Sequence, residues 1–271
     1  SHSAVMCSKF AALEFYLKGL FGRISDPKFS HTINERHLGR IHQINNYLAI
    51  INRIQTYSDG KACVITFNYD SLFEHNLGNQ APRCMQDYVS GDIKIFKLHG
   101  SHDWSYIQGK NLINYEREGV KDDFEWYLKH PDFINQNLKK DSNIRPYHEQ
   151  ELVRDNGKYA KFPAIAIPLV GKDKYICPLY HIQKLEQILP NIDRVLIIGW
   201  KAGDPLLLET LSNYLPKLGY KMLIVSNTIK DAEEIAGVVR KNMKLYNGVI
   251  AVHDGDFSDF VADEISNTFF V

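Results

Sequence analysis

Hydrophobic residues in the first sixty positions recur every three or four residues, which is the spacing of an amphipathic helix. This pattern runs over residues 8–22 and again over residues 33–57. We therefore predict that residues 1–60 form a mostly helical N-terminal part.

Short apolar runs replace the helical pattern after residue 60 and predict six strands. They lie at residues 63–67, 93–98, 164–169, 194–200, 221–226 and 248–253. Several are apolar at both alternating positions, which is typical of strands covered on two faces. Amphipathic helical segments separate or follow the later strands, at residues 205–217, 229–245 and 257–269. This alternation predicts an α/β fold with a Rossmann-like, doubly wound parallel sheet.

Residues 105–161 do not fit the alternation, because they are rich in charged residues, aromatic residues and asparagine. We predict a helical insertion or a small subdomain there. A chain of 271 residues can still be one domain with an insertion. We therefore predict a single domain over residues 1–271, whose Rossmann-like core comprises residues 61–104 and 162–271.

Composition narrows the choice of partners and location. The 32 basic and 32 acidic residues balance, so no net field attracts nucleic acid or an anionic membrane. No apolar run approaches the roughly 20 residues that span a bilayer, and we predict a cytoplasmic protein. The four cysteines form no paired ligand motif, which argues against a zinc module or a disulfide framework and for no bound metal; they are Cys7, Cys63, Cys84 and Cys177.

Polar residues follow four of the predicted strands. In a parallel α/β sheet, ligands bind outside the carboxyl ends of the strands, so these residues are candidates for a binding site. The four groups are Asn68, Tyr69 and Asp70; His99, Gly100, Ser101, His102 and Asp103; Lys201, Gly203 and Asp204; and Ser226 and Asn227.

Helix capping explains some of these residues without a ligand. Asp70 or Ser71 can cap the helix that follows, and Asp204 before a proline is a favoured N-cap arrangement. Ser226 and Asn227 also precede a predicted helix, where capping is the simpler role. His99 differs, because an imidazole at a ligand-binding edge is suited to act as a general base, although a structural role is also open to it.

Two segments carry a family resemblance. The stretch "TFNYDSLFEHNLG", which begins at Thr66, resembles the sirtuin segment T-Q-N-I-D-x-L-H-x-x-x-G, and "KLHGS", which begins at Lys97, resembles the sirtuin L-H-G-S. With Trp104 following, the pair is closer to bacterial sirtuin-like proteins of antiphage defence than to zinc-containing deacylases. Further along, "LIIGWKAGDP" resembles that branch's glycine turn, and "IVSN" resembles its strand end near the ribose and adenine.

This resemblance implies an NAD glycohydrolase that cleaves NAD, its substrate, to nicotinamide and ADP-ribose and depletes NAD in abortive infection. Asn68 and His99 would be catalytic, with Asn68 on the ribose or water and His99 as the base. Asp70 would orient the nicotinamide carboxamide. The other residues implied to bind NAD are Thr66, Phe67, Gly100, Gly199, Trp200, Ser226 and Asn227. The implied partners are further copies of the chain or a second defence protein, without direct binding to nucleic acid or membrane.

The sequence departs from the family in two ways. The zinc-binding cysteine quartet is absent, as in the defence branch, and no G-A-G-x-S phosphate loop precedes residue 60. Either the chain begins after that loop or the protein has lost it, and the helical N-terminal part favours the first explanation. The second explanation favours an alternative function, a sensor or scaffold that binds NAD or ADP-ribose without turnover. An NAD-dependent protein deacylase is the third alternative and fits least, since the zinc module is missing.

Overall fold

The computed structural model describes residues 2–26, 46–108, 119, 125–126, 129, 146–154, 160–167, 175–216, 220–243, 250–263 and 267–271. The chain forms two compact units. The first comprises residues 1–41, 64–91 and 95–179, and the second comprises residues 42–63, 92–94 and 180–271. Much of the predicted insertion, including residues 130–145, lies outside the described residues.

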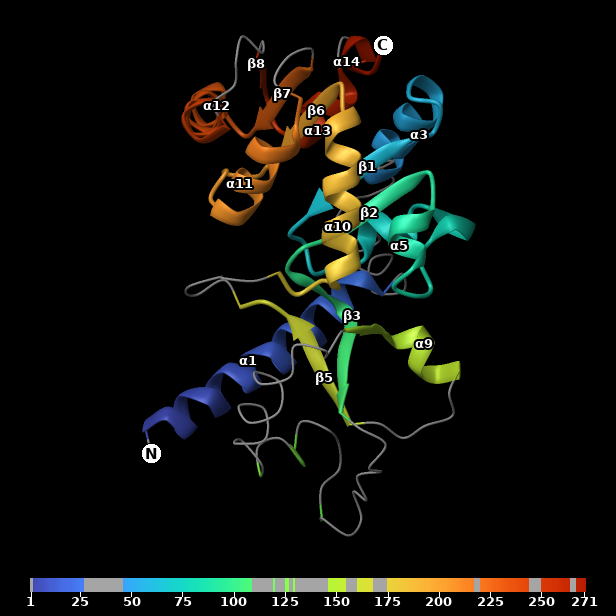
Figure 1. The fold of residues 1–271 in the computed structure, drawn as a ribbon, viewed down its shortest axis with the longest axis vertical. Helices are drawn as coiled ribbons and strands as arrows, with labels where there is room; N and C mark the ends of the chain where they lie inside the picture. Colours follow the sequence, from blue (N-terminus) through green and yellow to red (C-terminus); the bar gives the residue numbers. More distant parts are fainter. Residues whose placement is uncertain are drawn as a thin grey trace, which may run out of the picture. The chain divides into compact units, whose positions relative to one another are not determined.

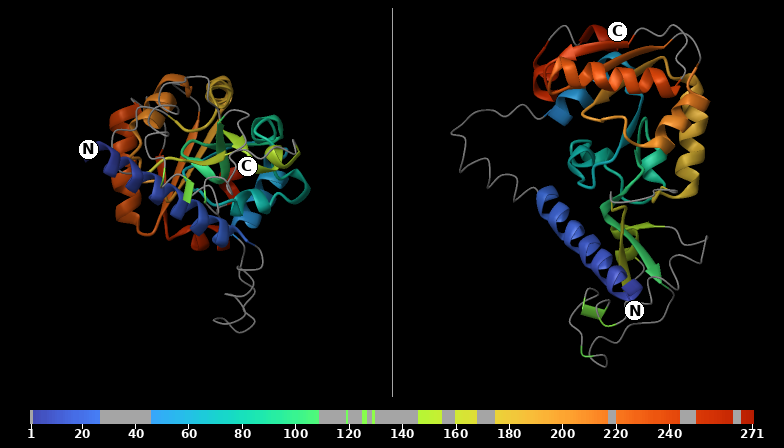
Figure 2. Two further views of the ribbon diagram at one scale, coloured as in Figure 1. Left: turned by 90° about the horizontal axis from the view of Figure 1, so that it is seen from below. Right: turned by 90° about the vertical axis from the view of Figure 1, so that its left-hand side faces the viewer.

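The first unit contains helix α1 (His2–Ser25), which confirms the first predicted helix. Its sheet has the strand order β4 (Tyr147–His148), β3 (Gly100–Gln108), β5 (Ala160–Ile165), and both pairings are antiparallel. Helix α1 runs alongside β3 and β5, as Figure 2 shows. Helix α9 (Glu149–Arg154) directly follows β4.

The strand predicted at residues 164–169 is wrong in its bounds and in its partner. Strand β5 begins at Ala160 and pairs antiparallel with β3, not within a parallel sheet. An apolar run shows that a strand is buried but not which strand lies beside it. The partner β3 escaped prediction because its first residues, among them His102 and Asp103, are polar and resemble the end of the preceding strand.

Strands β1 (Ala62–Thr66) and β2 (Ile93–Lys97) form a two-stranded sheet and match the predicted runs closely. Between them lie three short helices, α4 (Leu72–His75), η1 (Gly78–Gln80) and α5 (Asp87–Ser90). Strand β2 is largely buried, and the turn Leu98–His99 leads from it directly into β3.

The second unit contains a parallel sheet in the order β6 (Arg194–Ile198), β7 (Lys221–Ser226), β8 (Ile250–Asp254). Helix α11 (Pro205–Tyr214) connects β6 to β7, and α12 (Ile229–Met243) connects β7 to β8 (Figure 1). This arrangement confirms the predicted α/β, Rossmann-like class. The three strands differ in burial, since β7 buries Met222, Ile224 and Val225, whereas no residue of β8 is fully buried.

The remaining helices of the second unit are α3 (Asn46–Tyr57), α10 (Leu179–Ile188), η2 (Leu189–Asn191), α13 (Phe257–Ala262) and α14 (Asn267–Phe270). Helix α3 is the described part of the second predicted helix, while residues 33–45 lie outside the described residues. Arg53 attaches α3 to α13, because its guanidinium donates to the Val261 carbonyl at 2.7 Å and lies 5.7 Å from the centre of the Phe260 ring.

The first turns of α11 and α12 show which residues cap these helices. Asp204 caps α11 as predicted, since its Oδ1 accepts from the Leu207 N–H at 2.9 Å. For α12 the cap comes from Thr228, one residue after the predicted pair Ser226 and Asn227, and its Oγ1 accepts from the Asp231 N–H at 3.1 Å. In the described part of the chain, no helix is both long enough and apolar enough to cross a membrane.

Candidate functional site

Two loops of the first unit carry the predicted catalytic residues. One is the loop of residues 67–71 after β1, and the other is the turn Leu98–His99 after β2. The backbone N–H of His102 donates to the Tyr69 carbonyl at 2.9 Å, and the Ser101 hydroxyl donates to the same carbonyl at 3.2 Å. These bonds hold the loop after β1 against the start of β3, so the two sirtuin-like segments adjoin in the fold.

The loop of residues 67–71 is shaped by its own side chains. The Asn68 N–H donates to Thr66 Oγ1 at 3.1 Å, while the Asn68 residue is exposed. The Asp70 Oδ1 accepts from the Leu72 N–H at 3.1 Å at the start of α4. The helix cap considered for Asp70 or Ser71 is present only in part, because Ser71 is the N-cap residue of α4 but its side chain makes no capping bond. One of the two Asp70 carboxylate oxygens instead accepts from the first helical amide.

His99 is held through both its backbone and its ring. Its carbonyl accepts from the Ala166 N–H at 2.8 Å, and its imidazole lies 4.4 Å from the Phe67 ring, centre to centre. The residue is 9% exposed. Thus a predicted catalytic residue and a predicted NAD-binding residue from different loops are in direct contact.

Gly100 is required by the fold whatever it does for a ligand. Its φ is +82°, and a Cβ there would lie 1.8 Å from the carbonyl oxygen of Ala164 in β5. The glycine after His99 therefore permits a close backbone approach by the protein's own strand β5. A role for Gly100 in NAD binding stays a prediction.

A buried ion pair lies behind the loop of residues 67–71. Lys97 Nζ is 2.7 Å from Glu74 Oε1, and the two side chains are 0% and 5% exposed. The same ammonium donates to the backbone carbonyl of Asp70. Burial raises the pKa of Glu74, and the positive charge of Lys97 opposes this shift.

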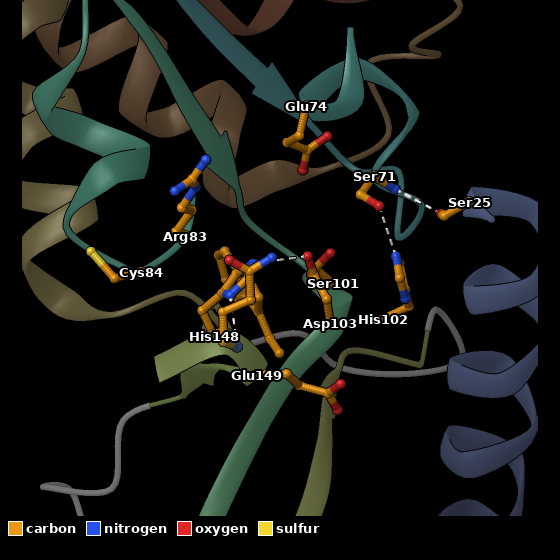
Figure 3. A network of polar contacts seen from close by, with 12 residues as sticks. Ser25, Ser71, Glu74, Arg83, Cys84, Ser101, His102, Asp103, His148 and Glu149 are labelled. Carbon is orange, nitrogen blue, oxygen red and sulfur yellow. Dashed lines mark hydrogen bonds and ion pairs between the residues drawn. The ribbon is translucent and has the colours of Figure 1, made fainter. Parts of the chain in front are cut away.

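The C-terminal end of α1 also contacts this loop. Ser25 Oγ accepts from the Ser71 N–H at 3.0 Å, and the Ser71 hydroxyl lies 2.9 Å from His102 Nε2 (Figure 3). The Phe21 ring packs 5.2 Å from the Tyr69 ring. Burial lowers the pKa of His102, which favours the neutral imidazole.

A second polar pair, between the buried His148 and the half-buried Asp103, joins β3 to β4. His148 Nε2 lies 3.1 Å from Asp103 Oδ2 (Figure 3). His148 Nδ1 accepts from the Gln150 N–H at 3.2 Å. Because Nδ1 is an acceptor, the proton is on Nε2, which donates to Asp103. Burial by itself raises the pKa of Asp103, but the hydrogen bond from His148 and the charge of Lys97 outweigh it and hold this pKa well below its usual range.

The depressed pKa of Asp103 predicts a pH-dependent contribution to stability. A carboxylate of this kind stabilises the fold above its unfolded pKa of about 3.9, and the contribution is lost as the pH falls further. We expect Asp103→Asn to lower the free energy of unfolding at pH 7 by roughly 1.5–3 kcal/mol, the range for hydrogen bonds to charged groups. Urea unfolding at pH 7 and at pH 3 should show the difference from the unaltered protein shrinking at pH 3.

The matched control for this prediction is Asp92→Asn, which removes an exposed carboxylate. Substitutions of exposed residues usually change stability by less than about 0.5 kcal/mol. An Asp103→Asn deficit of the same size at both pH values would contradict the assignment.

The other predicted NAD-binding residues lie in the second unit. Gly199 and Trp200 follow β6, and Ser226 and Asn227 lie at the end of the adjacent β7. The Gly199 N–H donates to the Val225 carbonyl at 3.1 Å, so both strand ends meet at one edge of the parallel sheet. The structure thus brings together six predicted residues in the first unit and four in the second; the six are Thr66, Phe67, Asn68, Asp70, His99 and Gly100.

The sequence analysis did not identify Lys97, Glu74 or His148 as residues that surround the candidate site in the first unit. For Lys97 a signal was available, because the period of two in a strand places it on the same face as the buried Ile93 and Ile95. A lysine on a buried face requires a partner. Nothing in the sequence pattern identifies Glu74 or the Asp70 carbonyl as that partner.

Comparison with known proteins gives a distant likeness. No protein-family model matches the chain, and no curated protein matches its sequence. A crystal structure of Sir2 with the inhibitor EX-527, 2′-O-acetyl-ADP-ribose and a deacetylated p53 peptide is 12% identical, with a TM-score of 0.41 over 90% of this chain and 80% of that one. A second structure, described as the basis for the mechanism and regulation of Sir2 enzymes, is 16% identical, with a TM-score of 0.34 over 81% and 79%. These likenesses are too distant to transfer a function.

Proposed function

We propose that the protein is an NAD glycohydrolase, which hydrolyses the bond between nicotinamide and ribose in NAD. The observation that supports this most is the junction of the two sirtuin-like segments within the first unit. The Tyr69 carbonyl accepts from His102 and Ser101, and the Phe67 ring contacts His99. The loop that carries Asn68 is therefore bonded to the start of β3, directly after His99, and its Phe67 ring contacts the His99 ring.

The chemistry requires positioning more than it requires reactive groups. The pyridinium is already cationic, so breaking its bond to ribose releases neutral nicotinamide and leaves an oxocarbenium-like sugar. Water adds to that carbon, and its proton passes to His99, which acts as general base. The Asn68 amide can both donate to and accept from the ribose or the water, and the Asp70 carboxylate can accept from the nicotinamide amide. The products are nicotinamide, ADP-ribose and one proton.

The physiological role that we propose is depletion of cellular NAD during phage infection. The resemblance of "TFNYD" and "KLHGS" to the antiphage-defence branch motivates it. The protein would act in the cytoplasm, without a metal and without direct binding to nucleic acid, as a homo-oligomer or with a partner defence protein. Comparing cellular NAD after infection with and without the protein tests this role apart from the chemistry.

The enzymatic proposal is tested by incubating the purified protein with NAD in ¹⁸O-labelled water and separating the products by chromatography. We expect equimolar nicotinamide and ADP-ribose, with one ¹⁸O atom at the ribose carbon that carried nicotinamide. Product that appears only with an acetylated peptide, as acetyl-ADP-ribose, would indicate a deacylase instead. Intact NAD together with tight binding in calorimetry would indicate a sensor.

A further inference from the structure

The buried pair of Lys97 and Glu74 takes no part in the proposed steps of NAD hydrolysis. We infer that Lys97 is a positioning residue for the site: with Glu74 it holds the loop of residues 67–71 so that Asn68 and Asp70 are presented in one geometry. The catalytic consequence of this inference rests on the proposed function, whereas the positioning of the loop does not.

The contacts of the ammonium carry the inference. Lys97 ends β2 and is fully buried, and its Nζ is 2.7 Å from Glu74 Oε1 in α4. It also donates to the backbone carbonyl of Asp70, within the loop itself. Two of the three ammonium donors are thus directed at the loop and at the helix that directly follows it.

The backbone carbonyl of Tyr69, next to that of Asp70, is also held by hydrogen bonds. The Tyr69 carbonyl accepts from His102 and Ser101 of β3, so the carbonyls of two consecutive loop residues are bonded to the β2–β3 segment. Because both carbonyls are held, the backbone that carries the side chains of Asn68 and Asp70 has a fixed conformation. Displacement of a catalytic group by about 1 Å can cost about 10²-fold in rate.

Stability is a poor explanation for this ion pair. Removing two charges from water costs several kcal/mol each, and replacing such a pair with apolar residues of similar volume is often neutral or stabilising. A pair kept only for stability would be replaceable in this way. A pair that positions the loop would not be, because an apolar side chain cannot donate to the Asp70 carbonyl.

The double variant Lys97→Met/Glu74→Leu separates these explanations, since it removes both charges and keeps most of the volume. Hydrogen exchange of the Asn68, Ser71 and Leu72 amides reports on the loop, because each donates to a side chain in the folded protein. We expect the urea midpoint to be unchanged or higher and these amides to exchange at least about tenfold faster. Unchanged exchange would overturn the inference, as would a double variant that fails to fold, since the pair would then be needed for the fold itself.

Asp204→Ala provides the control, because it weakens the cap of α11 in the second unit and should leave exchange of these three amides unchanged. If the unaltered protein cleaves NAD, the double variant should lower kcat/KM about 10²-fold at an unchanged urea midpoint. If it cleaves no NAD, the proposed function fails, and the exchange experiment still decides whether Lys97 positions the loop.

Discussion

Replacing His99 with alanine should lower kcat for NAD cleavage by roughly 10²-fold to 10⁴-fold, the usual contribution of a general base. KM should change little, since binding depends mainly on the residues around the base. The Phe67 ring beside the imidazole and the bond from Ala166 to the His99 carbonyl hold the residue in place, and the carbonyl bond does not depend on the side chain. Steady-state measurement of nicotinamide release gives both constants.

His99→Gln distinguishes loss of the base from loss of packing, because the amide fills part of the same space but does not accept a proton near pH 7. It should be as inactive as His99→Ala. His253→Ala, which removes a histidine from β8 in the second unit, is the control and should keep the activity. Turnover by His99→Ala equal to that of the unaltered protein would contradict the catalytic assignment.

Gly100→Ala should produce the largest loss of stability, at least about 3 kcal/mol, since strain from the left-handed backbone adds to overlap with a neighbouring strand. The new Cβ would lie 1.8 Å from the oxygen and 2.8 Å from the carbon of the Ala164 carbonyl. Both atoms belong to the backbone of β5, so relief requires breaking the pairing of Gly100 with Ile165. Urea unfolding followed by circular dichroism measures the loss.

Gly237→Ala is the matched control, because Gly237 lies exposed within α12 and a Cβ there meets no atom within 4 Å. The same chemical change should stabilise the protein by roughly 0.5–1 kcal/mol, as alanine is favoured over glycine in helix interiors. A Gly100→Ala protein as stable as the unaltered one would show that β5 does not approach Gly100 as described.

The sequence alone determined those features that depend only on residues close together in the chain: a strand, a helix cap and two short motifs. The run at residues 221–226 is strand β7 with the predicted bounds, because apolar residues at both alternating positions indicate two-sided burial. Asp204 followed by a proline caps α11 as predicted, since the cap and the amide that it accepts from are three residues apart. The motifs at residues 66–70 and 97–101 likewise point to the two candidate loops, because each motif is a run of consecutive residues.

Only the tertiary structure decided the pairings between distant residues. Strand β5 lies antiparallel to β3, Lys97 pairs with Glu74 23 positions away, and Asp103 pairs with His148 45 positions away. Hydrophobic periodicity reports that a side chain is buried, but the free energy of a buried charge depends on which group it meets. That group is set by how the strands and loops pack, which is why the sequence alone marked Asn68 and His99 as candidates but did not reveal the Lys97–Glu74 pair behind the loop that carries Asn68.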